Sequence, residues 1–244
     1  MRFWWIPRGR LWRKWWTQLY ANVERKYKTL YWTAHAIVGF LAKALFAMKT
    51  EGLENLPASG PAVVACNHVS ILDPILVGAA MPRLVHFMAK EELFHIPVLG
   101  FLIRKIGSFP VRRGNADRQA IRAGLEVLEA GEVLGIFPEG TRSLDGHLQR
   151  AQSGVALLAM KTGTPVIPAA IVGTEKALRK GRAFLRPARV RLLLGPPIHP
   201  PAGEITKESL AQFSARIMLA IAGLRDQLLA EGSVDAPPSL RKAQ

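Results

Sequence analysis

One stretch decides the fold: residues 61–74, Pro-Ala-Val-Val-Ala-Cys-Asn-His-Val-Ser-Ile-Leu-Asp-Pro. Its first part, Pro61–Cys66, is a short apolar run with β-branched residues, which predicts a buried strand. Its second part ends at Asp73 and Pro74, a pair that predicts a helix with Asp73 as N-cap and Pro74 at the first helical position. A strand followed at once by a helix is the repeating unit of an α/β sheet.

The same alternation continues downstream of this stretch. It predicts an α/β fold in which helices flank a largely parallel mixed sheet. The further predicted strands are Leu84–Met88, Gly107–Val111, Val133–Phe137, Pro165–Val172 and Val190–Leu194. The predicted helices are Asp73–Ala80, Val98–Lys105, Ala116–Ala130, Gln152–Thr162 and a last amphipathic helix, capped by Thr206, that runs to about Leu229.

The first fifty residues have a composition of their own. They hold ten Lys or Arg against one Glu, and so carry +9 of the formal net charge of +15. All six tryptophans lie within the first 32 residues. Indole rings suit the headgroup layer of a bilayer, and flanking cations suit anionic lipid. Tryptophan also stacks on single-stranded bases, but no recurrent nucleic-acid-binding pattern follows. The predicted partner is therefore a membrane surface and not nucleic acid; a basic helix packed on its own domain or in an oligomer is the alternative.

Residues 29–48 predict a second, apolar helix behind the basic one. Its longest uninterrupted apolar stretch is Ala36–Ala42, whereas a helix that crosses a bilayer needs ~20 mostly apolar residues. We therefore expect an N-terminal membrane-associating helical pair that lies in or dips into one leaflet. The predicted organisation is a basic, Trp-rich membrane-associating region (1–50), an α/β domain (51–232) and a flexible tail (233–244).

The chain contains one cysteine, Cys66, on the first predicted strand. A single cysteine excludes an intrachain disulfide and a cysteine-rich metal site, and it fits a reducing compartment. On a buried strand we expect it to pack in the core and not to act as a nucleophile. The histidines other than His68 show no metal-ligand spacing, so neither a metal nor a bound cofactor is expected.

His68 lies in the turn that leaves the first strand, five residues before Asp73. A loop of this length can fold the imidazole back to the carboxylate. Nδ1–H would then bond Asp73, and Nε2 would be free to take a proton. An ordinary turn histidine beside an ordinary N-cap has the same spacing, so both interpretations stay open at this point.

Two later loops carry groups that suit a phosphate. Arg112 and Arg113 follow a predicted strand and offer forked donors. Residues Glu139-Gly140-Thr141-Arg142 follow the next strand and combine a tight turn with hydroxyl, guanidinium and backbone donors. A solvated basic turn, and a plain turn held by a Glu–Arg pair, are the respective alternatives.

The ordered set of blocks is more specific than any one of them. Asn-His-x-Ser-x-x-Asp-Pro, Gly-x-Phe-Pro-Val-x-Arg, Phe-Pro-Glu-Gly-Thr-Arg-Ser and Val-Ile-Pro, spread over residues 67–168, resemble the glycerolipid acyltransferase family, the 1-acyl-glycerol-3-phosphate acyltransferases. The resemblance implies a catalytic pair, His68 and Asp73, and a substrate-binding set: Lys90, Arg113, Glu139, Gly140, Thr141 and Arg142. Arg112 departs from the family, since many relatives carry an acidic residue there.

The resemblance also implies a reaction. His68 would remove the proton of a lysolipid hydroxyl, which attacks the thioester of acyl-CoA or acyl-carrier protein directly, and the arginines would hold the acceptor phosphate. The expected acceptor is 1-acyl-glycerol-3-phosphate, the product phosphatidate, and the location the cytoplasmic face of a membrane with an anionic leaflet. One alternative is an acyltransferase for another lysolipid acceptor, and a second is a non-catalytic peripheral membrane protein. One assay with acyl-CoA and lysophosphatidate distinguishes an enzyme from the non-catalytic protein.

Overall fold

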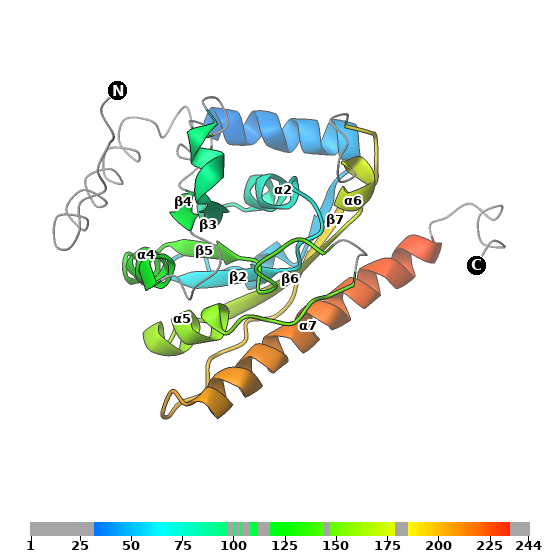
Figure 1. Cartoon of the computed structure of the whole chain (residues 1–244). Helices are drawn as coiled ribbons and strands as arrows, with labels where there is room; N and C mark the ends of the chain where they lie inside the picture. The colour runs from blue at the N-terminus through cyan, green and yellow to red at the C-terminus, as the bar shows by residue number, and fades with distance from the viewer. Residues whose placement is uncertain are drawn as a thin grey trace, which may run out of the picture.

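The computed structural model describes residues 32–96, 100, 103, 108–111, 118–143, 147–178 and 185–234. Within them a seven-stranded sheet has the order β1-β7-β6-β2-β5-β3-β4, with helices on both faces (Figure 1). The strands are β1 (Lys49–Glu51), β2 (Ala62–Cys66), β3 (Val85–Lys90), β4 (Phe109–Val111), β5 (Val133–Ile136), β6 (Val166–Val172) and β7 (Arg191–Leu194). The helices are 32–46, α2 (Asp73–Ala80), α4 (Arg118–Glu129), α5 (Gly154–Thr162), α6 (Thr174–Ala177) and α7 (Lys207–Val234), with 3₁₀ turns Leu53–Asn55 and Glu91–His95.

The sheet is mostly parallel, and the predicted fold class is confirmed. Every neighbouring pair of strands runs parallel except β6 and β7. The three central strands, β6, β2 and β5, therefore end at one edge of the sheet. In an open α/β sheet this carboxyl edge is where ligands bind.

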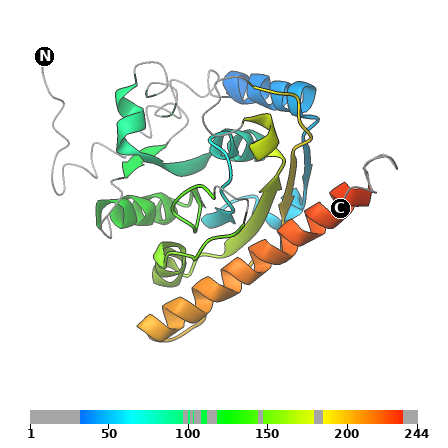
Figure 2. The ribbon, with the colours of Figure 1, turned by 45° about the vertical axis from the view of Figure 1, so that its right-hand side comes forward.

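Each face of the sheet has its own core. Val64 and Cys66 of β2 pack on the face that carries α2 and helix 32–46, whereas Val63 and Ala65 pack on the face that carries α4, α5 and α7. The side chains of a strand alternate between faces, so a strand buried on both sides reads as a continuous apolar run. In both ribbon views α2 lies between helix 32–46 and the sheet (Figures 1 and 2).

The predicted boundaries agree with the structure to within a few residues. β3 continues two residues beyond its predicted end and includes Lys90, and α7 continues through Val234. Thr206 caps α7 as expected, since its Oγ1 accepts from Ser209 N–H and its own N–H donates to Ser209 Oγ. Most of the predicted helix Val98–Lys105, the basic helix before residue 32 and residues 235–244 lie outside the described residues.

The sequence analysis missed β1. Lys49-Thr50-Glu51 has no apolar alternation, and its outer residues are exposed. The strand forms because β7 offers a free edge: β1 pairs with it in parallel register, Lys49 opposite Arg191 and Glu51 opposite Leu193. The division of the chain at residues 50 and 232 stays a prediction.

One predicted detail of α2 is wrong. The predicted range Asp73–Ala80 is correct, but Leu72 is the N-cap and Asp73 is the first helical residue. The Asp73 carboxylate does not cap its own helix. It turns back to the preceding loop, because backbone N–H groups at Val69 and Ser70 bind it there.

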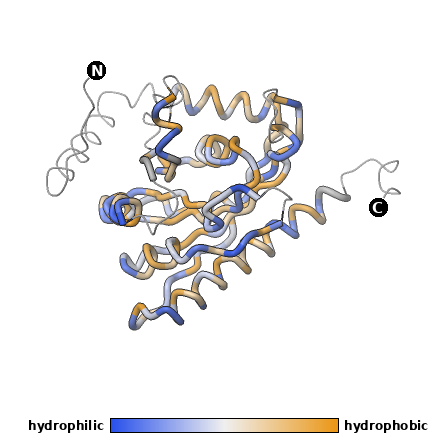
Figure 3. Tube along the Cα trace, viewed as in Figure 1, coloured by the Kyte–Doolittle hydropathy of each residue, from blue (hydrophilic) through white to orange (hydrophobic). Residues whose placement is uncertain are grey.

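Helix 32–46 has one packed face and one exposed apolar face. Ala42 and Phe46 are 3% and 5% exposed and join the core above the sheet. The opposite face exposes Trp32, Ile37, Phe40, Leu41 and Leu45, and Figure 3 shows that the helix is mostly apolar. Within the described ranges no helix combines the length and the hydropathy that crossing a bilayer requires.

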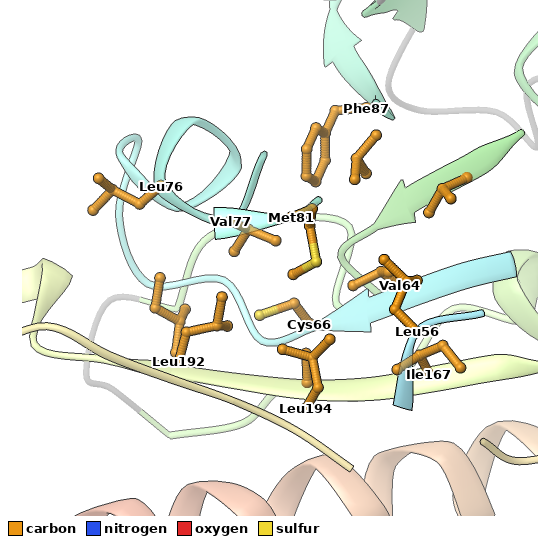
Figure 4. Close-up of a cluster of buried hydrophobic side chains, with 14 of the residues drawn as sticks. Leu56, Val64, Cys66, Leu76, Val77, Met81, Phe87, Ile167, Leu192 and Leu194 are labelled. Atoms are coloured by element: carbon orange, nitrogen blue, oxygen red, sulfur yellow. The ribbon is translucent and has the colours of Figure 1, made fainter. Parts of the chain in front are cut away.

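Cys66 packs in the core, as predicted. Its side chain is 1% exposed and lies among Met81, Leu192 and Leu194 in the cluster drawn in Figure 4. Burial, and then the carboxylates of Asp73 and Glu139, raise the pKa of the thiol well above its usual value. The thiol therefore stays protonated near neutral pH, and we assign it no chemical step.

An ion cluster ties the far end of α7 to the sheet edge. The Arg191 guanidinium on β7 donates to Glu51 of β1, at 2.8 Å, and to Glu231 of α7. The hydrogen bond from Arg191, and then that from Gln227, lower the pKa of the half-exposed Glu231 carboxyl. Ionisation of the Glu231 carboxyl is thus more favourable in the folded chain than in the unfolded chain.

Glu231→Gln should make the stability of the chain less sensitive to acid. Because the folded chain lowers the pKa of Glu231, this group stabilises the fold above the ordinary pKa of glutamate, ~4.3, and the effect is lost as the pH falls through the folded value. Thermal unfolding should show a gap in Tm between wild type and variant at pH 7 that closes below about pH 4. Glu204→Gln, at an exposed residue before α7, is the control and should show no such closing gap.

Candidate functional site

Three loops meet at the carboxyl edge of the central strands. Asn67 and His68 follow β2, residues 137–143 follow β5, and Gly173 and Thr174 follow β6. The strands are adjacent and parallel, so segments about seventy and one hundred residues apart come together here. The described members of the predicted site that follow β2 and β5 therefore lie at one edge of the sheet.

His68 and Asp73 form the predicted contact. The Nδ1 atom of His68 lies 2.8 Å from Asp73 Oδ2. A carboxylate oxygen accepts, so Nδ1 carries the hydrogen and Nε2 is left with its lone pair. Asp73 is fully buried, whereas the His68 side chain is 12% exposed. This geometry lets Nε2 act as a base toward a ligand, as in other His–Asp pairs.

Three further hydrogen bonds hold the Asp73 carboxylate. Oδ2 accepts from the backbone N–H groups of Val69 and Ser70, each at 2.7 Å. Oδ1 accepts from the Thr174 hydroxyl at 2.6 Å. A buried charge costs little only when its hydrogen-bonding capacity is satisfied. The ionised carboxylate is therefore fixed in place before any substrate arrives.

The imidazole of His68 is held by ring packing as well. It stacks on Phe137, with ring centroids 4.1 Å apart and planes 20° from parallel. Phe137 in turn stacks on Phe87 of β3, with centroids 5.7 Å apart. A ring fixed on one face and bonded at Nδ1 has little freedom to turn, so the direction of Nε2 is set by the protein.

The backbone of His68 is clamped by the loop after β5. Its N–H donates to Glu139 Oε1 at 2.9 Å, and its carbonyl accepts from Ser143 N–H at 2.8 Å. The second Glu139 oxygen accepts from Gln149 N–H at 2.9 Å. Glu139 is 3% exposed, so this carboxylate joins two loops inside the protein. No ion pair between Glu139 and Arg142 is present in the part of the chain that the structure describes.

The tight turn at Gly140 has a clear requirement for glycine. Its φ is +67°, and a Cβ there would lie 2.2 Å from the Gln152 side-chain nitrogen. The turn places Thr141, which is exposed, and Arg142, which is half-buried, after the buried Glu139. These two side chains are therefore the accessible members of the loop.

Two predicted substrate-binding residues cannot be placed at side-chain level. Lys90 ends β3, but its side chain lies outside the described part, and Arg113 lies wholly outside it. Their assignment stays a prediction. Among the described residues, no group of three or more His, Cys, Asp or Glu side chains has the arrangement of a metal site.

The sequence analysis missed three residues that shape the site: Asn67, Phe137 and Thr174. The Asn67 amide bonds both the carbonyl and the N–H of Ile171 on β6, at 3.0 and 2.8 Å. It thus continues the β2–β6 ladder with a side chain. Asn67 and Phe137 each open one of the quoted sequence blocks, which could have indicated them, but Thr174 is 101 residues from Asp73 and carried no local signal.

Comparison with known proteins gives a consistent result. The family model described as Acyltransferase matches residues 47–172. A 1-acyl-sn-glycerol-3-phosphate acyltransferase of Bacillus subtilis (strain 168) is 35% identical over 185 residues, covering 74% of this chain and 89% of that protein. A chloroplast protein of the same name from Arabidopsis thaliana is 36% identical over 158 residues, covering 63% of this chain but only 44% of that protein.

A solved structure shares the fold. The crystal structure of the 1-acyl-sn-glycerophosphate acyltransferase from Thermotoga maritima superposes with a TM-score of 0.67 at 28% sequence identity. The match covers 88% of each chain. The likeness thus extends over most of the chain and is not confined to the motifs.

Glu139→Gln should destabilise the fold and disturb the site. A glutamine would turn an NH₂ group toward a backbone N–H that now donates to the carboxylate, so one buried donor would lose its acceptor. We expect the free energy of unfolding in urea to fall by about 1–3 kcal/mol. Glu129→Gln, at an exposed residue that ends α4, is the matched control. Equal unfolding curves for the two variants would show that the clamp contributes nothing.

Proposed function

This chain belongs to the acyltransferase family, and on that premise we propose that it transfers a fatty acyl group to the free hydroxyl of 1-acyl-glycerol-3-phosphate. The product is phosphatidate, so the step belongs to phospholipid synthesis. The observation that carries the proposal is the His68–Asp73 pair, held at 2.8 Å at the carboxyl edge of the sheet. The names of the relatives from Bacillus subtilis and Thermotoga maritima support the acceptor.

The geometry favours direct attack by the acceptor. Nε2 of His68 takes the hydroxyl proton as the acceptor oxygen bonds the thioester carbon, and Asp73 stabilises the imidazolium. The carbon–sulfur bond then breaks, and the imidazolium returns the proton to the leaving thiolate. No protein nucleophile is needed, since the acceptor hydroxyl attacks the thioester directly. The thiol of Cys66 is 1% exposed and its pKa is raised, so it takes no part.

The loop after β5 would hold the phosphate of the acceptor. Arg142 follows the tight turn at Gly140, and its guanidinium fits a phosphate in a forked manner. Glu139, Gly140 and Thr141 complete the predicted substrate-binding loop, with Glu139 acting through the backbone it fixes. Arg113 and Lys90 are assigned to the same site from the family resemblance alone. Binding the phosphate at one end positions the hydroxyl at the other.

The donor is a thioester of coenzyme A or of acyl-carrier protein. Either supplies the same acyl carbon and the same thiolate leaving group, so the site chemistry is shared. The donor and the acceptor alone supply every atom and proton of this reaction. We therefore propose that the chain uses no resident cofactor or metal.

We further propose that the protein works on the cytoplasmic face of an anionic membrane. Both the acyl chain and the lysolipid partition into lipid, so an enzyme resting on the leaflet avoids extracting them. Helix 32–46 supports this location, since its outer face exposes Ile37 (54%), Phe40 (70%) and Leu41 (44%) next to the exposed Lys43. An apolar face flanked by cations suits the boundary between headgroups and chains.

His68→Ala should abolish acyl transfer without unfolding the chain. The base is lost, which costs roughly 10²-fold or more in kcat, while Asp73 keeps its bonds to Val69, Ser70 and Thr174. The measurement is formation of phosphatidate from lysophosphatidate with acyl-CoA and with acyl-carrier protein as donors. Full activity of this variant would rule out the base assignment.

The same assay decides between acceptors. A panel of lysolipids, run with the wild-type protein, should give the highest kcat/KM for 1-acyl-glycerol-3-phosphate. A higher value for a lysolipid without a terminal phosphate monoester would favour the alternative acceptor, and no transfer to any of them would favour a non-catalytic membrane protein.

Replacing Ile37, Phe40 and Leu41 together by serine should weaken binding to anionic vesicles about tenfold or more. The three side chains are large, apolar and 44–70% exposed, and burying them in lipid drives adsorption. Ala42 and Phe46 are retained, so the core packing of the helix is kept. Leu219→Ser is the control, because Leu219 is 73% exposed on α7, across the sheet from helix 32–46. Equal sedimentation of both variants with vesicles would contradict the proposal.

A further inference from the structure

We infer that Thr174 is a positioning residue for the His68–Asp73 pair. Its hydroxyl lies 2.6 Å from Asp73 Oδ1, and both side chains are fully buried. The consequence for catalysis rests on the proposed function, whereas the contact between Thr174 and Asp73 does not. It assigns a role to a residue that lies after the last of the sequence blocks, at the end of β6.

The Thr174 hydroxyl fixes the plane of the carboxylate. The backbone N–H groups of Val69 and Ser70 both bind Oδ2, the same oxygen that accepts from His68. With Oδ2 alone anchored, the carboxylate could swing about that atom. The bond to Oδ1 is the second anchor, and two anchored oxygens hold the lone pair of Oδ2 in line with the His68 Nδ1–H bond.

The turn after β6 delivers this hydroxyl with little freedom. Gly173 has φ +92°, and a Cβ there would lie 2.0 Å from the Arg189 carbonyl oxygen. Its N–H donates to Glu175 Oε2 at 2.9 Å. The resulting tight turn starts α6 at Thr174, whose hydroxyl reaches Asp73 in the first turn of α2.

β6 therefore supports both ends of the His68–Asp73 segment. Asn67 is bonded to Ile171 of β6 at the start of the segment, and Asp73 is bonded to Thr174 at its end. Residues 67 to 73 are thereby fixed to β6 and the turn that follows it, independently of the clamp that Glu139 supplies from the loop after β5. A segment held at two points can aim a ring more closely than one held at a single point.

The test compares Thr174→Val with Thr174→Ser. Valine has nearly the shape of threonine but no hydroxyl, so Oδ1 loses its donor; serine keeps the hydroxyl. We expect Thr174→Val to lower kcat about 10- to 100-fold with the acceptor KM within about twofold, and Thr174→Ser to restore most of the rate. A rate equal to that of wild type in Thr174→Val would overturn the inference.

Thr164→Val is the matched control. Thr164 is also a buried threonine whose hydroxyl is bonded, to Thr162 Oγ1 at 2.7 Å, but it precedes β6 at the opposite edge of the sheet. Both valine variants should unfold at a lower temperature than wild type, and only Thr174→Val should lose turnover. Equal losses of turnover would show a general loss of stability and would overturn the inference.

A second readout does not depend on activity. Protein labelled with ¹⁵N at histidine gives chemical shifts for both ring nitrogens of His68, and these shifts report which nitrogen carries the hydrogen. The signals of His68 are assigned as those that disappear in His68→Ala. We expect the Nδ1–H tautomer in wild type and Thr174→Ser, and a mixture with Nε2–H in Thr174→Val. An unchanged tautomer would contradict the positioning role even if no lysolipid were turned over, so this failure is distinct from failure of the proposed function.

Discussion

The buried carboxylate of Asp73 is the group on which the rest of the site depends. A charge that is fully removed from water is tolerable only when donors surround it, and the chain supplies four from two segments. The loop after β2 provides His68 Nδ1 and the N–H groups of Val69 and Ser70, and the turn after β6 provides the Thr174 hydroxyl. Satisfying one anion thus fixes the local path of the chain and the orientation of the imidazole together.

The parallel sheet makes this convergence possible. β6, β2 and β5 are neighbours in space but not in sequence, and their carboxyl ends share one edge. Glu139 from β5 and Thr174 from β6 therefore reach the same short segment from opposite sides. The proposed chemistry falls to residues 68 and 73, while Glu139 and Thr174, which hold them, follow the flanking strands β5 and β6. The exposed apolar face of helix 32–46 lies on the α2 side of this same sheet.

Much of the fold could be predicted from the local pattern of apolar residues. A strand buried on both faces is a continuous apolar run, whereas an amphipathic helix repeats its apolar residues every three or four positions. The central strands and α4, α5 and α7 were predicted within a few residues. β1 was missed because a three-residue edge strand is held by backbone pairing to β7 and not by its own side chains. The N-cap of α2 was misplaced because Asp73 has two sets of backbone donors within reach, and the hydrogen bonds of the folded loop decide between them.

The residue pattern alone was enough to predict the α/β fold and, through the order of the four blocks, the family; the pairing of His68 with Asp73 was left open by spacing and implied only by the family resemblance. The fold and the family follow from residue spacing within about a hundred residues and from the chemical character of single side chains, both of which can be read without knowing the tertiary contacts. Three contacts could be seen only in the folded chain: Glu139 clamps the His68 backbone, Phe137 stacks on the His68 ring, and the Thr174 hydroxyl binds the second oxygen of Asp73. Such contacts depend on which strands become neighbours, and that choice is a property of the whole packed chain.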